Sequence, residues 1–196
     1  MASRKKVWQQ FSNEIQATYV KGKAFKSDRI EALFKKWQIV YDIFAVPAGS
    51  VILVYTRVRA PYIAKSDFKF RITKKNFFNK ISAKFRKANV ETGDSRLDDI
   101  FVIKSNCAEK VKKLLSNEKI SSLLLKYPKS GVEFSHGYKS IGRVFPKNCD
   151  GLSFVMLYES TGEERLMTIY KLFGEILTSL HDAGEIEAAP VDTELK

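Results

Sequence analysis

The chain has 196 residues, 29% of them charged, and a formal net charge of +12. A hydrophobic share of 44% with only 10 glycines and 5 prolines excludes a fibrous or fully disordered chain and favours one globular domain. No apolar run reaches the roughly 20 residues of a membrane-spanning helix, and two cysteines without metal-site spacing exclude a common structural zinc site.

Charge is distributed unevenly along the chain. Residues 1–90 contain 20 Lys/Arg and 5 Asp/Glu, whereas residues 91–196 contain 14 and 17. Such a split favours an acidic partner, although lysine-rich surfaces also serve solubility alone. The first residues contain no apolar segment of signal-peptide length, so we expect a cytoplasmic location, which includes the periphery of a membrane.

The basic half begins with helical periodicity and continues with strands. Apolar residues spaced by three and four predict a helix over 5–20, and Ser27 as a cap predicts a second, short helix with Ile30, Leu33 and Phe34 on one face. Alternation then predicts strands over 37–44 and 51–59 around a Pro-Ala-Gly-Ser turn, and a third strand over 68–73. Residues 74–88 have an apolar stripe and a lysine-rich remainder, which predicts an amphipathic helix.

The second half opens with a polar loop over 91–99 and a strand over 100–104. Asn106 with Glu109 has the spacing of a capping box, which predicts a helix, and a further short helix precedes Pro128. Two or three strands are expected within 131–160, most clearly over 152–159. Thr161 with Glu164 predicts the cap of a long helix that ends at Gly184.

This order of elements predicts an α+β fold with antiparallel sheet flanked by amphipathic helices. Both halves end in an amphipathic helix after strands, which favours two similar α/β layers. We expect one domain over 1–184, composed of a basic half (1–90) and a mildly acidic half (91–184). The acidic tail over 185–196 lacks periodicity and is expected to be disordered.

The central segment resembles a family of uncharacterised bacterial proteins. The resemblance lies in Thr92-Gly93-Asp94, then Leu97-Asp98, then an aromatic strand over 101–106 that leads into a leucine-rich helix. It covers about residues 90–125, and Leu97 stands where the family pattern has Phe. The resemblance implies a bacterial, non-secreted setting and gives no reaction and no catalytic residues.

Three aspartates and one histidine are the candidates for catalysis. Asp94, Asp98 and Asp99 lie in one loop and could supply oxygen ligands to a divalent cation, but their spacing does not match the calcium-loop signature. A turn at Gly93 with carboxylates bonded to nearby backbone is the simpler interpretation. His136 could act with these aspartates in a small hydrolase, although no nucleophile motif accompanies it.

The sequence predicts no cofactor and no metal. Neither the phosphate-binding loop of common nucleoside triphosphatases nor a dinucleotide fingerprint is present. The cysteines Cys107 and Cys149 are too far apart in the chain for their spacing to decide whether they meet.

The basic half provides the main functional hypothesis, which is a non-enzymatic binding or adaptor domain. Its cationic surface would contact an acidic protein, an anionic membrane surface or nucleic acid. The alternatives are a small hydrolase or metal-dependent enzyme using the Asp94–Asp99 loop, and an oligomerisation or scaffold protein. The residues expected to bind the anion are Arg57, Arg59, Lys69, Arg71, Lys74, Lys75, Lys80, Lys84, Arg86 and Lys87.

Overall fold

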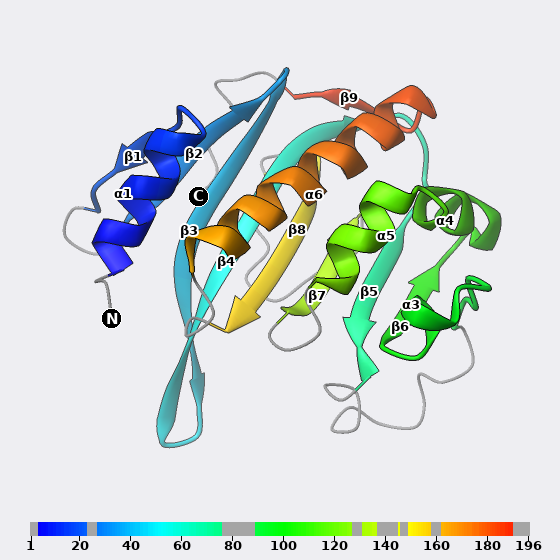
Figure 1. Ribbon diagram of the computed structural model, residues 1–196, viewed down its shortest axis with the longest axis horizontal. Helices are drawn as coiled ribbons and strands as arrows, with labels where there is room; N and C mark the ends of the chain where they lie inside the picture. The colour runs from blue at the N-terminus through cyan, green and yellow to red at the C-terminus, as the bar shows by residue number, and fades with distance from the viewer. Residues whose placement is uncertain are drawn as a thin grey trace.

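A computed structural model describes residues 4–22, 27–75, 89–126, 131–136, 145, 149–157 and 162–189. These residues form one antiparallel sheet with helices, which confirms the α+β class (Figure 1). The strands are β1 Thr18–Val20, β2 Arg29–Phe34, β3 Trp37–Ala48, β4 Val51–Ala64, β5 Phe70–Lys74, β6 Phe101–Ser105, β7 Gly131–His136, β8 Asp150–Leu157 and β9 Ile186–Ala188. The helices are α1 Arg4–Glu14, α3 Ser95–Asp98, α4 Ala108–Leu115, α5 Glu118–Leu125 and α6 Glu163–Asp182.

Strands from both halves of the chain join in the same sheet. Their order is β1-β2-β3-β4-β8-β7-β5-β6, and β9 pairs with β4 outside this path. Strand β8 therefore lies between β4 and β7 and connects the two halves. The similarity of two α/β layers stays a prediction, since the sheet itself is continuous.

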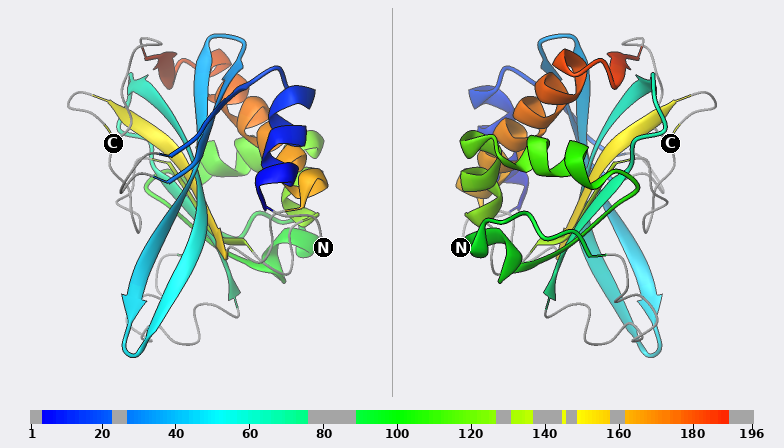
Figure 2. Two further views of the ribbon diagram at one scale, coloured as in Figure 1. Left: turned by 90° about the vertical axis from the view of Figure 1, so that its left-hand side faces the viewer. Right: turned by 90° about the vertical axis from the view of Figure 1, so that its right-hand side faces the viewer.

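The helices cover one face of the sheet, with α6 lying across the strands (Figure 2). Leu166, Ile169, Phe173, Ile176 and Leu177 of α6 are fully buried, as their helical spacing predicted. Burial of each such side chain contributes about 1.5–3 kcal/mol. The strands supply the opposite half of the core through alternate residues.

Alternation also defines a second face of the sheet, turned away from the helices. On β4, Val58 and Ala60 belong to the core beneath the helices. Their neighbours Arg57 and Arg59 therefore lie on the second face. A row of residues in register crosses this face from β3 to β6: Val40, Arg59, Ser153, Ser135, Arg71 and Lys104.

The short helix predicted after Ser27 is wrong, because Arg29–Phe34 forms strand β2. Ile30 and Ala32 are buried on one face, a period of two that the helical spacing of Ile30, Leu33 and Phe34 had masked. Ser27 therefore caps no helix. The carboxylate of Asp28 accepts hydrogen bonds from the Tyr19 hydroxyl (2.6 Å) and the Gly22 amide (2.9 Å).

Helix boundaries differ from prediction at three further places. Helix α1 ends at Glu14, and residues 18–20 of the predicted helix form β1. Cys107 rather than Asn106 precedes α4, so the first capping box is wrong. The Asn106 side chain instead bonds the backbone of Lys69 and Asp67. Gly162 precedes α6, one residue after the predicted cap.

The predicted helix over 74–88 lies outside the described residues from 76 onward. The predicted loop over 91–99 contains the short helix α3, which Asp94 caps by accepting from the Arg96 amide (3.0 Å). Within the part of the chain that the structure describes, no helix is long and apolar enough to span a bilayer.

The start of the acidic tail is ordered, contrary to the expectation of disorder from residue 185. Gly184 ends α6 with φ +72°, as predicted. Residues 186–188 then pair with β4 as β9, and Glu185 is buried. Residues 190–196 lie outside the described part.

Candidate functional site

The β3–β4 hairpin extends beyond the rest of the sheet (Figure 1). On one side, the last pair that β3 makes with β2 involves Tyr41; on the other, β4 pairs with β8 as far as Tyr55. Among the described residues, 45–54 pair only with each other, from Ala45 opposite Val54 to Ala48 opposite Val51. We call residues 45–54 the hairpin tip.

An ion-pair cluster holds the base of the hairpin on the second face of the sheet. Asp42 lies opposite Arg57 in register, and its two carboxylate oxygens accept from Arg57 Nε (2.8 Å) and Nη2 (2.6 Å). Arg59 Nη2 donates to the same carboxylate at 2.7 Å. Both guanidinium groups therefore bind the same carboxylate.

Burial makes this cluster structural rather than an open anion site. Arg59 is 1% exposed and Arg57 is 9% exposed. Burial lowers the pKa of the Arg59 guanidinium, and Asp42 opposes that shift. Both arginines were predicted to bind an acidic partner, and the structure places them in contact with Asp42.

An aromatic pair continues the cluster toward the tip. Phe44 and Tyr55 lie opposite each other and stack with ring centroids 5.3 Å apart. The Arg57 guanidinium carbon lies 5.1 Å from the Phe44 centroid, within cation–π range. Cross-strand pairs of this kind stabilise a hairpin. The tip therefore projects from a base that ion pairs and ring stacking make rigid.

The hairpin tip itself is apolar and exposed. Between Asp42 and Arg57 the chain has no charged residue. Val51 and Ile52 are 55% and 69% exposed, and Leu53 is also exposed. Because neighbours in a strand point to opposite faces, Ile52 and Leu53 make both faces of the ribbon apolar.

The accessible cations lie on β5 and β6. Arg71 and Lys104 are opposite each other in register on the second face, and Lys69 precedes Arg71 by two residues. All three are partly exposed. Burial lowers the pKa of Lys104, and repulsion from Arg71 adds to that shift. We call Lys69, Arg71 and Lys104 the β5–β6 cations.

Two further predicted cations lie at the end of β5. Lys74 is the last residue of β5 and Lys75 is exposed beside it. The register puts this end of β5 at the same end of the sheet as the hairpin tip, because β5 and β8 both run toward it. Lys80, Lys84, Arg86 and Lys87 lie outside the described residues.

The aspartate loop forms a backbone-bonded turn. Asp98 accepts from the Thr92 amide, the Thr92 hydroxyl and the Gly93 amide at 2.8–3.0 Å, and Asp94 binds the Arg96 guanidinium. The hydrogen bond from Arg96 lowers the pKa of Asp94, which makes it a poor proton donor. Asp99 is the C-cap of α3. Among the described residues, no cluster of potential metal ligands occurs.

His136 is far from this loop and enclosed by aromatic rings. It is 3% exposed and its Nδ1 lies 2.5 Å from the Tyr62 hydroxyl. Its ring stacks on Phe70 with centroids 5.1 Å apart. His136 pairs with Phe70, which pairs with Ser105, whereas the aspartates precede the other end of β6. The length of β6, roughly 13 Å, therefore separates the predicted acid and base groups.

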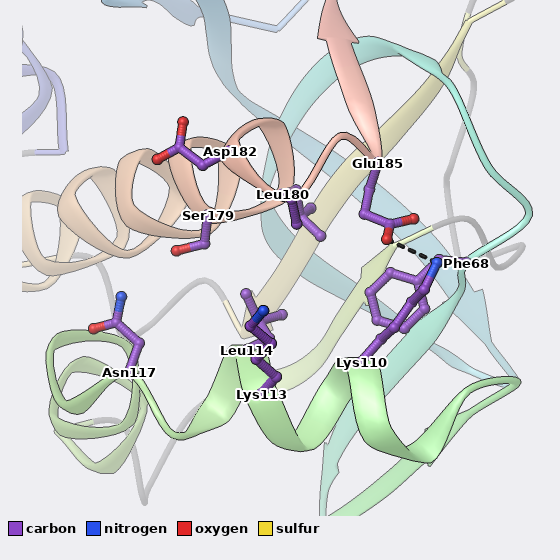
Figure 3. A pocket seen from close by; sticks show the side chains of 10 residues that line it. Phe68, Lys110, Lys113, Leu114, Asn117, Ser179, Leu180, Asp182 and Glu185 are labelled. Atoms are coloured by element: carbon purple, nitrogen blue, oxygen red, sulfur yellow. Dashed lines mark ion pairs between the residues drawn. The ribbon is translucent and has the colours of Figure 1, made fainter.

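A cavity of about 470 Å³ lies between α4, the start of α5 and the end of α6 (Figure 3). Lys110 and Glu185 meet at its rim with Nζ and Oε1 2.7 Å apart, and Lys110 lies above the Phe68 ring. Glu185 also accepts from the Ser66 hydroxyl. The residues that line this cavity include cations, anions and apolar side chains, and none of them forms a pair of nucleophile and base. Cys107 and Cys149 are both free thiols.

Sequence reasoning missed two parts of this site, namely Asp42 and the exposed tip. Predicting a two-residue turn at Gly49-Ser50 would have put Asp42 opposite Arg57, since hairpin register follows from the turn. The sequence contains no comparable indication that the tip is exposed, because the apolar residues of the tip are those expected of a buried strand.

Comparisons with known proteins show a likeness of fold alone. No family model and no curated protein matches the chain. One solved structure, the mycobacterial trehalose monomycolate transport factor A (TtfA), is similar with a TM-score of 0.50 and 7% sequence identity. The match covers 89% of this chain and 94% of that one. The resemblance in residues 90–125 to uncharacterised bacterial proteins stays a prediction.

Proposed function

We propose that the chain is a non-enzymatic binding domain whose basic surface contacts an acidic partner. The observation that carries this proposal is the pairing of Arg71 with Lys104 across β5 and β6. Both side chains are partly exposed on the second face of the sheet, where an acidic partner can reach them.

The charge of the whole molecule supports the same function. The chain has a net charge of +12, and the +15 of residues 1–90 includes Lys69, Arg71 and the lysines of 74–88. A field of this size attracts polyanions and speeds their association at low ionic strength. The separation of the aspartate loop from buried His136 gives the enzyme alternative no comparable support.

Charge reversal tests the proposal. The double variant Lys69→Glu/Lys104→Glu should bind heparin, used as a soluble polyanion, at least tenfold more weakly than the wild type. Its salt dependence should also be shallower, because fewer counterions are released. Fluorescence titration at several salt concentrations measures both effects.

A matched control distinguishes binding at the β5–β6 cations from attraction by the net charge of the whole molecule. Lys6→Glu/Lys171→Glu changes the net charge equally, but its exposed lysines lie on α1 and α6 across the sheet. This variant should retain most of the affinity. Equal losses in both variants, or no heparin binding by the wild type at low salt, would contradict the proposal.

A further inference from the structure

We propose that the hairpin tip inserts into the interfacial layer of an anionic lipid bilayer, so that the acidic partner is a membrane surface. The inference rests on the proposed function for its electrostatic part and adds the apolar contact. The apolar contact depends on the shape, composition and exposure of residues 45–54, not on the β5–β6 cations.

No residue of the hairpin tip belongs to the core of the described chain. Val51, Ile52 and Leu53 are among the exposed large hydrophobic residues of the described chain, and they are consecutive. No other described strand pairs with residues 45–54. A contiguous apolar group on a projecting element marks an interaction site.

A partner of the tip has to fit a ribbon that is apolar on both faces. A protein partner normally covers one face of such a ribbon and leaves the other in water. A bilayer surrounds the inserted element on all sides, which suits Ile52 on one face and Val51 and Leu53 on the other. The tip therefore matches a lipid environment better than a protein groove.

The length of the tip matches the depth of the interfacial layer of a bilayer. From Val51 to Val54 the ribbon rises roughly 10 Å, which matches the 5–10 Å that interfacial elements enter. Deeper insertion would bring unpaired strand edges into hydrocarbon, where unsatisfied backbone groups are costly. Pro47, which has no N–H, leaves one donor fewer on the tip. The charged base at Asp42 and Arg57 sets the limit of entry.

Cationic residues accompany the apolar tip at its end of the sheet. Lys74 and Lys75 lie at the same end of the sheet as the tip. Cations near an anionic leaflet each strengthen binding, while apolar insertion fixes the orientation.

Vesicle flotation with the full chain tests the inference. Vesicles of phosphatidylcholine with 30% phosphatidylserine should bind the wild type. The variant Ile52→Asp should bind them at least tenfold more weakly. The matched control Leu33→Asp makes the same change at a residue that is 53% exposed on β2, away from the tip, and should bind as the wild type does. Circular dichroism verifies that both variants are folded.

A tryptophan at the tip reports insertion directly. Trp8 and Trp37 are 0% and 2% exposed, so they contribute a constant background. In Ile52→Trp, fluorescence should shift to the blue on vesicle binding and be quenched by lipids brominated near the headgroup. An unshifted, unquenched signal with bound vesicles would overturn the inference.

The outcomes distinguish this inference from the proposed function. If Ile52→Asp binds anionic vesicles as the wild type does, while Lys69→Glu/Lys104→Glu binds heparin weakly, insertion fails and the basic surface stands. If Ile52→Asp loses vesicle binding but the charge-reversed variant keeps heparin affinity, insertion stands and the basic surface fails. If sedimentation shows a wild-type dimer that Ile52→Asp dissociates with no change in vesicle binding, the tip contacts a second copy, and insertion is overturned.

Discussion

The interior beneath α6 and the hairpin tip have the same kinds of side chain in opposite environments. Ile176 is 0% exposed against the sheet, whereas Ile52 is 69% exposed at the end of a two-stranded ribbon. Both lie in apolar runs with regular periodicity. The difference is whether another element packs on the run, so apolar periodicity by itself does not identify a core residue.

Truncating both isoleucines gives the largest expected contrast. Ile176→Ala should lower the free energy of unfolding by about 3 kcal/mol, because it leaves a cavity in a fully packed interior. Ile52→Ala should change it by less than about 0.5 kcal/mol. Urea unfolding monitored by circular dichroism measures both. A loss above about 1 kcal/mol in Ile52→Ala would mean that the tip packs against the body.

The comparison also shows which parts of the fold the sequence could predict. Helix α6 was predicted with its buried face, because one stripe of a long helix repeats many times. Residues 29–34 were predicted as helix, because a segment of six residues fits both the helical period and the strand period of two. The pairing of β2 with β3 decides in favour of the strand. Exposure of the tip depends on how far its neighbouring strands extend, which no local pattern contains.

The candidate site was predictable only in part for a related reason. Arg57, Arg59 and Arg71 were selected by charge, but charge does not reveal that Asp42 lies against the first two. Lys104 was missed, since its register with Arg71 joins strands nearly thirty residues apart in the chain. Asp94 and Asp98 were correctly interpreted as turn residues, since their bonds are local.

The hairpin base provides the next prediction, since it joins the body to the tip. Asp42→Ala should lower the free energy of unfolding by about 2 kcal/mol, because buried Arg59 and Arg57 lose the carboxylate that both bind. Asp67→Ala, at an exposed residue, is the control and should have little effect. Thermal unfolding of the two variants measures the contrast. Equal stability would show that the cluster does not hold the hairpin.

A smaller effect of about 1 kcal/mol is expected where the ordered start of the tail meets the body. Burial raises the pKa of Glu185, but hydrogen bonds from Lys110 and Ser66 outweigh it and hold the pKa below its ordinary value. The resulting stability is present above the ordinary glutamate pKa and is lost as the pH falls through the lowered value. Glu185→Gln should therefore cost about 1 kcal/mol at neutral pH and nothing in acid.

Unfolding of Glu185→Gln at neutral and acidic pH measures this dependence. Glu187→Gln on β9 is a matched control, because its ion pair with Lys65 is half-exposed and contributes little. A cost for Glu185→Gln that does not change with pH would show that its charge is not what stabilises the contact between the tail and α4.

The smallest expected change in stability is that of Ile52→Asp, which tests directly whether the hairpin tip differs from the core. Ile52→Asp should leave the free energy of unfolding within about 0.5 kcal/mol of the wild type, because the side chain is in water in both states. The same variant should raise solubility, since it breaks an exposed apolar run. Unfolding curves and the protein concentration at which light scattering rises measure the two effects. An exposed apolar residue that adds nothing to stability is available for a contact outside the chain. A stability loss in this variant would remove the main reason to regard the tip as a binding element.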